Sequence, residues 1–79
     1  MNPIIRSAER AAYILDVSPQ AFREQAKRGF NNYSKVVKGK NKRTYEFYPY
    51  IAAEYLRVPV QAFEKRDMEL EFQGRLKSG

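Results

Sequence analysis

The chain has 79 residues, 43% of them hydrophobic and eleven of them Tyr or Phe, which is enough for one small packed domain and too few for two ordinary ones. It contains neither Cys nor His, which excludes disulfides, thiolate–zinc sites, the usual serine and cysteine triads and most transition-metal sites. The net charge of +6 lies entirely in residues 1–48, which carry ten Lys or Arg against four Asp or Glu, while residues 49–79 carry five of each; this asymmetry favours a polyanionic partner on one side of the molecule.

Membrane-spanning and catalytic roles are not expected from the sequence. No apolar run approaches the ~20 residues that cross a bilayer, and no segment resembles a signal peptide, so we expect a cytoplasmic protein. Without His or Cys, catalysis would depend on carboxylates, Lys or Tyr, and the acids of the C-terminal half interleave with bases as on a solvated helix. The chain has no phosphate-cradling glycine loop and no carboxylates at metal-ligand spacing. We therefore expect no enzyme, no metal and no other cofactor.

Two short helices joined by a tight turn are predicted near the N-terminus. Ser7 can cap a helix over residues 8–15, because its hydroxyl accepts a bond from an amide of the first turn. Ser18 can cap a second helix over residues 19–28, whose first position is a proline. Gly29 can end that helix in the left-handed conformation.

The two predicted helices differ in the faces they present. The first carries an apolar stripe at i, i+3, i+4 and i+7, made of Ala8, Ala11, Ala12 and Leu15. In the second, Phe22 and Ala26 share one side, and polar residues point the opposite way: Gln20, Arg23, Glu24 and Lys27. A polar, mostly cationic outer face suits a DNA recognition helix, since Arg and Gln match guanine and adenine edges. An ordinary helical hairpin with a solvated face gives the same pattern, so periodicity alone leaves both interpretations open.

A β-hairpin is predicted after the second helix. Residues 33–38 and 44–48 are rich in β-branched and aromatic side chains, and the stretch between them contains the turn formers Gly and Asn. Alternation along the second strand places Tyr45 and Phe47 on one face. Because a lone hairpin is marginal in water, this face is expected to pack on the helices.

The segment from Lys35 to Arg43 has five bases in nine residues and no acid. A basic loop is often no more than a solvated loop. Here it directly follows a helix–turn–helix pattern, and its Gly and Asn place it at an exposed tip, where basic side chains can reach phosphates or a minor groove. The sequence does not choose between these two kinds of contact.

Two further helices complete the predicted fold. Pro49 begins the third, which runs to about Arg57 with a packing face made of Ala52, Tyr55 and Leu56. A break at Val58-Pro59 leads to a C-terminal helix within residues 58–73, and a flexible tail is expected at 74–79. The chain is then a single domain, mainly α, with about four helices and one two-stranded hairpin.

An internal repeat appears at an offset of 41 residues. Ala11-Ala12, Leu15, Val17 and Gln20-Ala21-Phe22 correspond to Ala52-Ala53, Leu56, Val58 and Gln61-Ala62-Phe63. A duplicated second helix–turn–helix accounts for this, and so does a helical pair that only buttresses the first. We favour the buttress, because Glu64 replaces Arg23 in the second unit and its surroundings are neutral, which suits a phosphate backbone poorly.

The pattern from Ser7 to Gly29 carries a resemblance to a known group of domains. It reads S-A-x-x-A-A-x-x-L-x-V-S-P-Q-A-F-R-x-x-x-x-x-G, and a basic hairpin and another helix follow it. This resembles the winged helix–turn–helix DNA-binding domains of phage and transposon excisionases and of MerR-type regulators. The resemblance covers roughly residues 5–57, and its specificity is moderate, because many helix–turn–helix families share the same small residues, turn and caps.

The resemblance implies that the helix after Ser18 lies in a major groove and that the hairpin is a wing beside it. The DNA-facing residues implied in the recognition helix are Ser18, Gln20, Ala21, Arg23, Glu24 and Lys27. Those implied in the wing are Lys35, Lys38, Lys40, Asn41, Lys42 and Arg43. Those implied along the DNA backbone are Arg6, Ser7 and Arg28.

The same resemblance implies a role in recombination or transcription. Excisionases are small and basic, bind adjacent sites cooperatively, and bend DNA so that an integrase excises an element. MerR-type regulators carry a long coiled coil and an effector site, for which this chain has no room. An excisionase-like recombination directionality factor is therefore implied, or a small phage or mobile-element transcription regulator, in a bacterial or phage-infected cell. Phe22 departs from the family pattern, in which a smaller aliphatic is more common, and the residues after Arg57 have no clear match.

The partners implied are double-stranded DNA, with an integrase or further copies of the chain beside it, and neither a membrane nor a small-molecule effector. Two other classes of function stay open. A protein–protein adaptor, such as an anti-repressor or an enzyme inhibitor, fits the apolar residues of the C-terminal segment: Phe63, Met68, Leu70, Phe72 and Leu76. RNA binding is a less favoured interpretation, because the aromatic residues lie at spacings typical of core packing and not on a platform for stacking bases. A steep salt dependence of DNA binding would separate a DNA reader from an adaptor.

Overall fold

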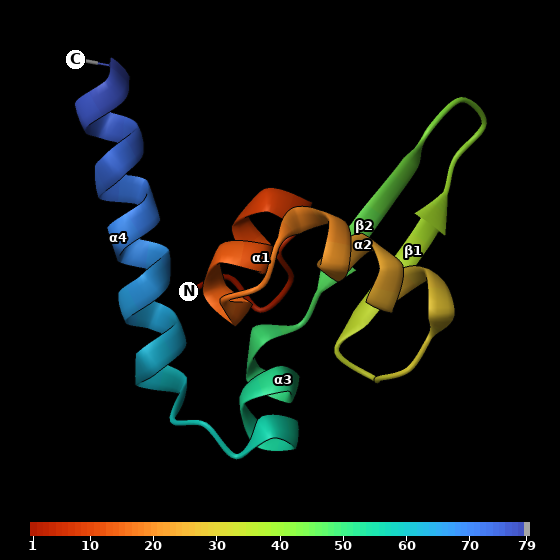
Figure 1. Ribbon diagram of the computed structural model, residues 1–79, viewed down its shortest axis with the longest axis horizontal. Helices are drawn as coiled ribbons and strands as arrows, with labels where there is room; N and C mark the ends of the chain where they lie inside the picture. Colours follow the sequence, from red (N-terminus) through yellow and green to blue (C-terminus); the bar gives the residue numbers. More distant parts are fainter. Residues whose placement is uncertain (79) are drawn as a thin grey trace.

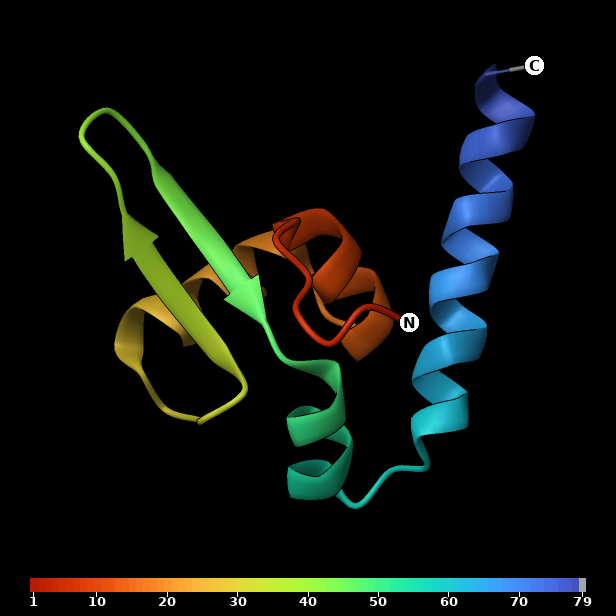
Figure 2. The same ribbon diagram turned by 180° about the vertical axis from the view of Figure 1, so that it is seen from behind.

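The computed structural model describes the backbone of residues 1–78 and the side chains of residues 1–74. Its elements are α1 (Ala8–Leu15), α2 (Pro19–Arg28), β1 (Ser34–Lys38), β2 (Arg43–Phe47), α3 (Pro49–Leu56) and α4 (Val60–Ser78). The predicted class, mainly α with four helices and one antiparallel hairpin, is confirmed. The hairpin projects at one end of the molecule and α4 stands at the other, with α1 and α2 between them (Figures 1 and 2).

Local capping fixes the ends of α1 and α2, as predicted. The Ser7 Oγ accepts the Arg10 amide at 3.2 Å, and the Ser18 Oγ accepts the Ala21 amide at 3.1 Å. Gly29 ends α2 with a φ of +66°, a left-handed conformation that glycine adopts without strain. Both helix boundaries agree with the sequence prediction because capping chemistry acts within a few residues.

The hairpin pairs Ser34 with Phe47 at its base and Lys38 with Arg43 at its tip. Its strands begin and end one residue away from the predicted bounds, except at Lys38. The chain before α1 adds a third short partner to the sheet, because Ile5 and Phe47 exchange both backbone hydrogen bonds, at 2.9 and 2.8 Å. This pairing anchors the N-terminal segment on β2.

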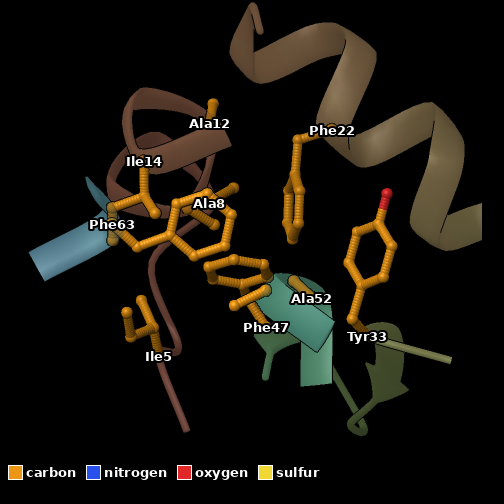
Figure 3. Close-up of a cluster of buried hydrophobic side chains, with 11 residues drawn as sticks. Ile5, Ala8, Ala12, Ile14, Phe22, Tyr33, Phe47, Ala52 and Phe63 are labelled. Carbon is orange, nitrogen blue, oxygen red and sulfur yellow. The ribbon is translucent and has the colours of Figure 1, made fainter. Parts of the chain in front are cut away.

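Phe47 is the centre of the core (Figure 3). It is fully buried, and three aromatic rings surround it: Phe22 of α2 at 5.9 Å, Tyr33 at 6.2 Å and Phe63 of α4 at 6.5 Å between centroids. The Phe22 and Tyr33 rings meet Phe47 edge to face, and such pairs stabilise a core by about 0.5–1.5 kcal/mol each beyond the area they bury. The small residues of α1 let the helix approach this cluster closely, and Ile5 lies at its edge (Figure 3).

Two predicted packing faces need correction. In α1 the fully buried large residue is Ile14, whereas Leu15 is only half-buried. In α3 the side chains of Tyr55 and Leu56 are 58% and 43% exposed, and the buried residues are Pro49, Ala52 and Ala53. Both groups of residues in α3 satisfy helical spacing. The group with the smaller side chains is buried, because the alanines allow a closer approach to the aromatic core.

The helix α4 is longer than predicted and is held against α1 by polar contacts. It runs to Ser78 rather than ending near residue 73, so the predicted tail falls on helical backbone except for Gly79, which lies outside the described residues. Arg10 binds both carboxylate oxygens of the buried Asp67, with Nη2 at 2.9 Å from Oδ2. This hydrogen bonding raises the pKa of Arg10, against the opposing effect of burial. Arg66 also donates to the Ile14 carbonyl at 2.8 Å.

The repeat seen in the sequence is also a repeat in backbone geometry. Asp16 ends α1 with φ, ψ of 59°, 44°, and Arg57 ends α3 with 57°, 43°. The next amide bonds back in the same way in both turns, from Val17 to Ala12 at 3.0 Å and from Val58 to Ala53 at 2.9 Å. The turns within the two helical pairs therefore have the same conformation, and each pair contributes a phenylalanine to the ring cluster around Phe47.

Within the described residues, none of the four helices combines the length and the apolarity that crossing a membrane requires.

Candidate nucleic-acid interface

The outer face of α2 is oriented as the sequence predicted. Phe22 and Ala26 are buried on the inner side, and the Phe22 ring packs edge-on against Tyr45 and Phe47 of β2. The polar residues face outward. Ser18, Gln20 and Lys27 are exposed, and Arg23 and Glu24 are partly exposed. Ala21 is partly buried, and the Ser18 hydroxyl also serves as the helix cap.

Arg23 is held by a residue that the sequence did not single out. Its Nη2 lies 2.6 Å from Oε1 of Glu9, which is in the first turn of α1. The pair is solvent-exposed and so contributes little to stability, and it places the guanidinium beside the first turn of α1 on the outer face. The sequence offered no local signal, because the two residues are fourteen apart and meet only through the crossing of α1 and α2.

Glu24 lies at the middle of the remaining polar contacts on α2. Its Oε1 accepts from Gln20 Nε2 at 3.3 Å and is 4.0 Å from Lys27 Nζ, and its other oxygen is 3.9 Å from Arg28 Nε. Arg28 also stacks on the exposed ring of Phe30, at 5.8 Å. The positive charge of α2 is therefore partly balanced within the helix.

The hairpin is the stronger cationic surface. Asn41 at the tip is exposed, and so are all the basic residues of the hairpin: Lys35, Lys38, Lys40, Lys42 and Arg43. Among the side chains that the structure describes, no carboxylate lies at ion-pairing distance from any of these five. A polyanion can meet these cations without displacing an existing ion pair.

Cations from α2 and from both strands meet in one place. Lys27, Val36, Lys38 and Arg43 line a shallow groove of about 230 Å³ between the helix and the hairpin. The strand register explains this, because Val36, Lys38 and Arg43 lie on the same side of the sheet as Phe47, which packs on α2. Val36, and not the exposed Val37, thus faces the helix.

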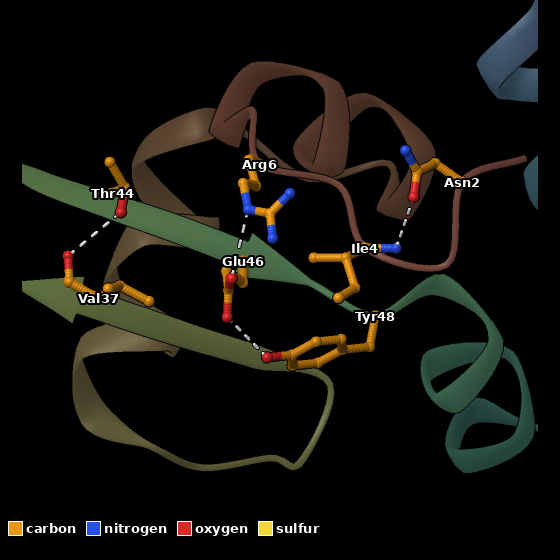
Figure 4. A network of polar contacts seen from close by, with 7 residues as sticks. All are labelled: Asn2, Ile4, Arg6, Val37, Thr44, Glu46 and Tyr48. Atoms are coloured by element: carbon orange, nitrogen blue, oxygen red, sulfur yellow. Dashed lines mark hydrogen bonds and ion pairs between the residues drawn. The ribbon is translucent and has the colours of Figure 1, made fainter.

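The opposite side of the hairpin carries a separate polar network (Figure 4). Arg6 Nε lies 3.4 Å from one oxygen of Glu46, and the Tyr48 hydroxyl donates to the other at 2.8 Å. The hydrogen bond to Glu46, aided by burial, raises the pKa of Tyr48. Lys35 lies opposite Glu46 in the register and so belongs to this side as well.

The predicted DNA-facing residues of the hairpin and the N-terminal segment therefore lie in three places. Lys38 and Arg43 share a groove with Lys27 of α2, whereas Arg6 and Lys35 lie on the far side of the hairpin. Lys40, Asn41 and Lys42 are exposed in the loop at the tip. The hydroxyl of Ser7 is engaged by the first turn of α1. Within the described residues, no group of three or more acidic side chains is placed to hold a metal ion.

No protein-family model matches this chain, and no curated protein or solved structure matches it either. The resemblance to excisionase and MerR-type domains thus stays a prediction carried by the residues from Ser7 to Gly29 and by the hairpin.

Proposed function

We propose that this protein binds double-stranded DNA sequence-specifically, with α2 in the major groove and the hairpin against the neighbouring backbone or minor groove. The observation that carries the proposal is the groove between α2 and the hairpin, where Lys27, Lys38 and Arg43 converge beside the outward polar face of the helix. A helix of this size fits a major groove, and the cations between α2 and the hairpin can bind phosphates at the edge of that groove.

The two surfaces have different tasks in this proposal. Gln20 and Arg23 read base edges, since Gln pairs with adenine and Arg with guanine through two hydrogen bonds. Glu9 and Glu24 hold these side chains on the outer face before DNA arrives. The hairpin cations supply the affinity that does not depend on sequence, because they have no carboxylate partner among the described side chains to give up.

Two biological roles fit such a protein. The first is an excisionase-like factor that binds and bends DNA beside an integrase, and the second is a small regulator of transcription in a phage or mobile element. The arrangement of target sites decides between them. Selection of bound sites from a random DNA pool would yield tandem direct repeats for a cooperative excisionase and an inverted repeat for a twofold-symmetric regulator.

The experiment that tests DNA binding compares two charge-matched variants. Arg43→Gln removes a cation from the groove, and Arg57→Gln removes one from the exposed turn between α3 and α4. Anisotropy titrations of a selected duplex at several salt concentrations should show weaker binding and a shallower salt slope, by about 0.9 per lost phosphate contact, for Arg43→Gln only. Equal behaviour of the two variants, or binding that salt does not affect, would refute the interface and favour the adaptor class.

A further inference from the structure

Phe30, the second residue after α2, carries a large apolar ring that is 69% exposed. The chain is held on both sides of this ring. Before it, the Gly29 amide closes the helix on the Gln25 carbonyl at 3.1 Å. After it, the Asn31 Oδ1 accepts the Tyr33 amide at 3.2 Å and the Ser34 hydroxyl at 2.7 Å. The fold therefore presents the ring to solvent in one defined place.

A row of side-chain contacts connects Phe30 to the outer face of α2. Gln20 donates to Glu24 at 3.3 Å, and the other oxygen of Glu24 lies 3.9 Å from Arg28 Nε. The Arg28 guanidinium then stacks on the Phe30 ring, 5.8 Å from its centroid. Residues 20, 24 and 28 lie at i, i+4 and i+8, on one side of the helix. The ring thus ends a row that begins on the face proposed to enter the major groove.

The surroundings of the ring fit a nucleic acid better than a protein. The other residues from Lys27 to Asn32 are two cations, a glycine and two asparagines. A contact surface for a protein consists of several adjacent large apolar side chains, and this stretch contains one. The apolar group that a base pair presents in the major groove is the C5-methyl of thymine, and Phe is a side chain that contacts it.

We propose that Phe30 is a specificity-determining residue that contacts the C5-methyl group of a thymine in the major groove, with Arg28 stacked on its ring. The inference rests on the proposed function, because it takes α2 to lie in that groove. From Gln20 to Phe30 the chain advances about 15 Å at 1.5 Å per residue, which is roughly four base-pair steps of 3.4 Å. The thymine therefore lies near one end of the site, roughly four base pairs from the base that Gln20 reads.

Replacement of thymine by uracil tests the contact, because it removes only the methyl group. Each thymine of a selected duplex is replaced in turn, and binding of the full chain is followed by competition anisotropy. One replacement should weaken binding by about fourfold, as expected for one buried methyl group. Phe30→Ala should bind the thymine duplex more weakly by a similar factor and bind the uracil duplex no worse. The matched control is Phe72→Ala, which truncates a side chain that is 61% exposed on α4 and should keep the full preference for thymine.

Fluorescence gives a second readout of the same contact. The chain has no tryptophan, so Phe30→Trp and Phe72→Trp each introduce a single one. Binding of the selected duplex should protect the side chain at position 30 from quenching by acrylamide and leave position 72 as accessible as before. Circular dichroism confirms that each variant is folded.

Three results would overturn the inference while duplex binding persists: no thymine whose methyl group matters, a methyl effect that Phe30→Ala leaves unchanged, or a tryptophan at position 30 that DNA does not protect. Each of these leaves the proposed function intact. Absence of specific duplex binding by the unmodified chain would refute the proposed function and this inference together.

Discussion

The clamp between Arg10 and Asp67 should respond very differently to the loss of each partner. The Asp67 side chain is 9% exposed and that of Arg10 is 41% exposed. Arg10→Met keeps the aliphatic stem but leaves a buried carboxylate without its cation, which destabilises a fold by about 3–5 kcal/mol. Asp67→Asn leaves a guanidinium that still reaches water, so we expect a loss of only about 1 kcal/mol. A domain of this size is stable by roughly 4–12 kcal/mol.

Urea unfolding followed by circular dichroism measures the difference. With a slope of about 1 kcal/mol/M, Arg10→Met should lower the unfolding midpoint by about 3–5 M and Asp67→Asn by about 1 M, at an unchanged slope. The double variant should be more stable than Arg10→Met alone, because it removes the unpaired charge. Equal losses for the two single variants, or a double variant that simply adds them, would show that the asymmetric burial of the pair does not govern its energetics.

Two further predictions concern the helix α2 and the tyrosines. Arg23→Ala should weaken DNA binding by about 1–3 kcal/mol at one base position. Glu9→Gln should raise the affinity for all duplexes and reduce the discrimination between DNA sequences. Competition between selected and scrambled sites measures both effects, and a uniform loss of affinity in Glu9→Gln would contradict a role for the Glu9–Arg23 pair in DNA binding. Burial raises the pKa of Tyr33, and the hydrogen bond to Glu46 raises the pKa of Tyr48. The protonated phenols therefore stabilise the fold fully below their ordinary pKa of about 10. This stabilisation is lost as the pH rises through the higher pKa values of the folded state. Urea midpoints should fall above that pH, and Tyr48→Phe should reduce the fall; an unchanged fall would argue against that hydrogen bond.

The sequence predicted most of the fold because its signals are local. The caps at Ser7 and Ser18, the glycine after α2 and the alternation around Phe47 each act within a few residues. The prediction of the packing face of α3 was wrong because local signals do not decide it. Ala53 and Leu56 both satisfy helical spacing, and only the shape of the aromatic core decides which of them is buried.

The candidate site was less predictable, because its geometry depends on contacts distant in sequence. Glu9 reaches Arg23 only through the crossing of α1 and α2. Arg6 lies on the far side of the hairpin because Ile5 pairs with Phe47 and carries its neighbour to Glu46. Composition alone shows which residues are basic, but it could not divide them between the two sides of a two-stranded sheet.

The arrangement assigns α1 a role beyond packing. Two consecutive residues of this helix hold the two outward-facing helices: Glu9 orients Arg23 on α2, and Arg10 binds Asp67 on α4. Because these two contacts come from neighbouring residues of one helix, a change at one could disturb the other. Asp67→Asn alters the contact with α4 and leaves the pair of Glu9 with Arg23 in place. We therefore expect Asp67→Asn to lower the stability of the fold while leaving the preferred bases unchanged in a selection of bound sites; altered base preferences would show that α1 couples the two helices.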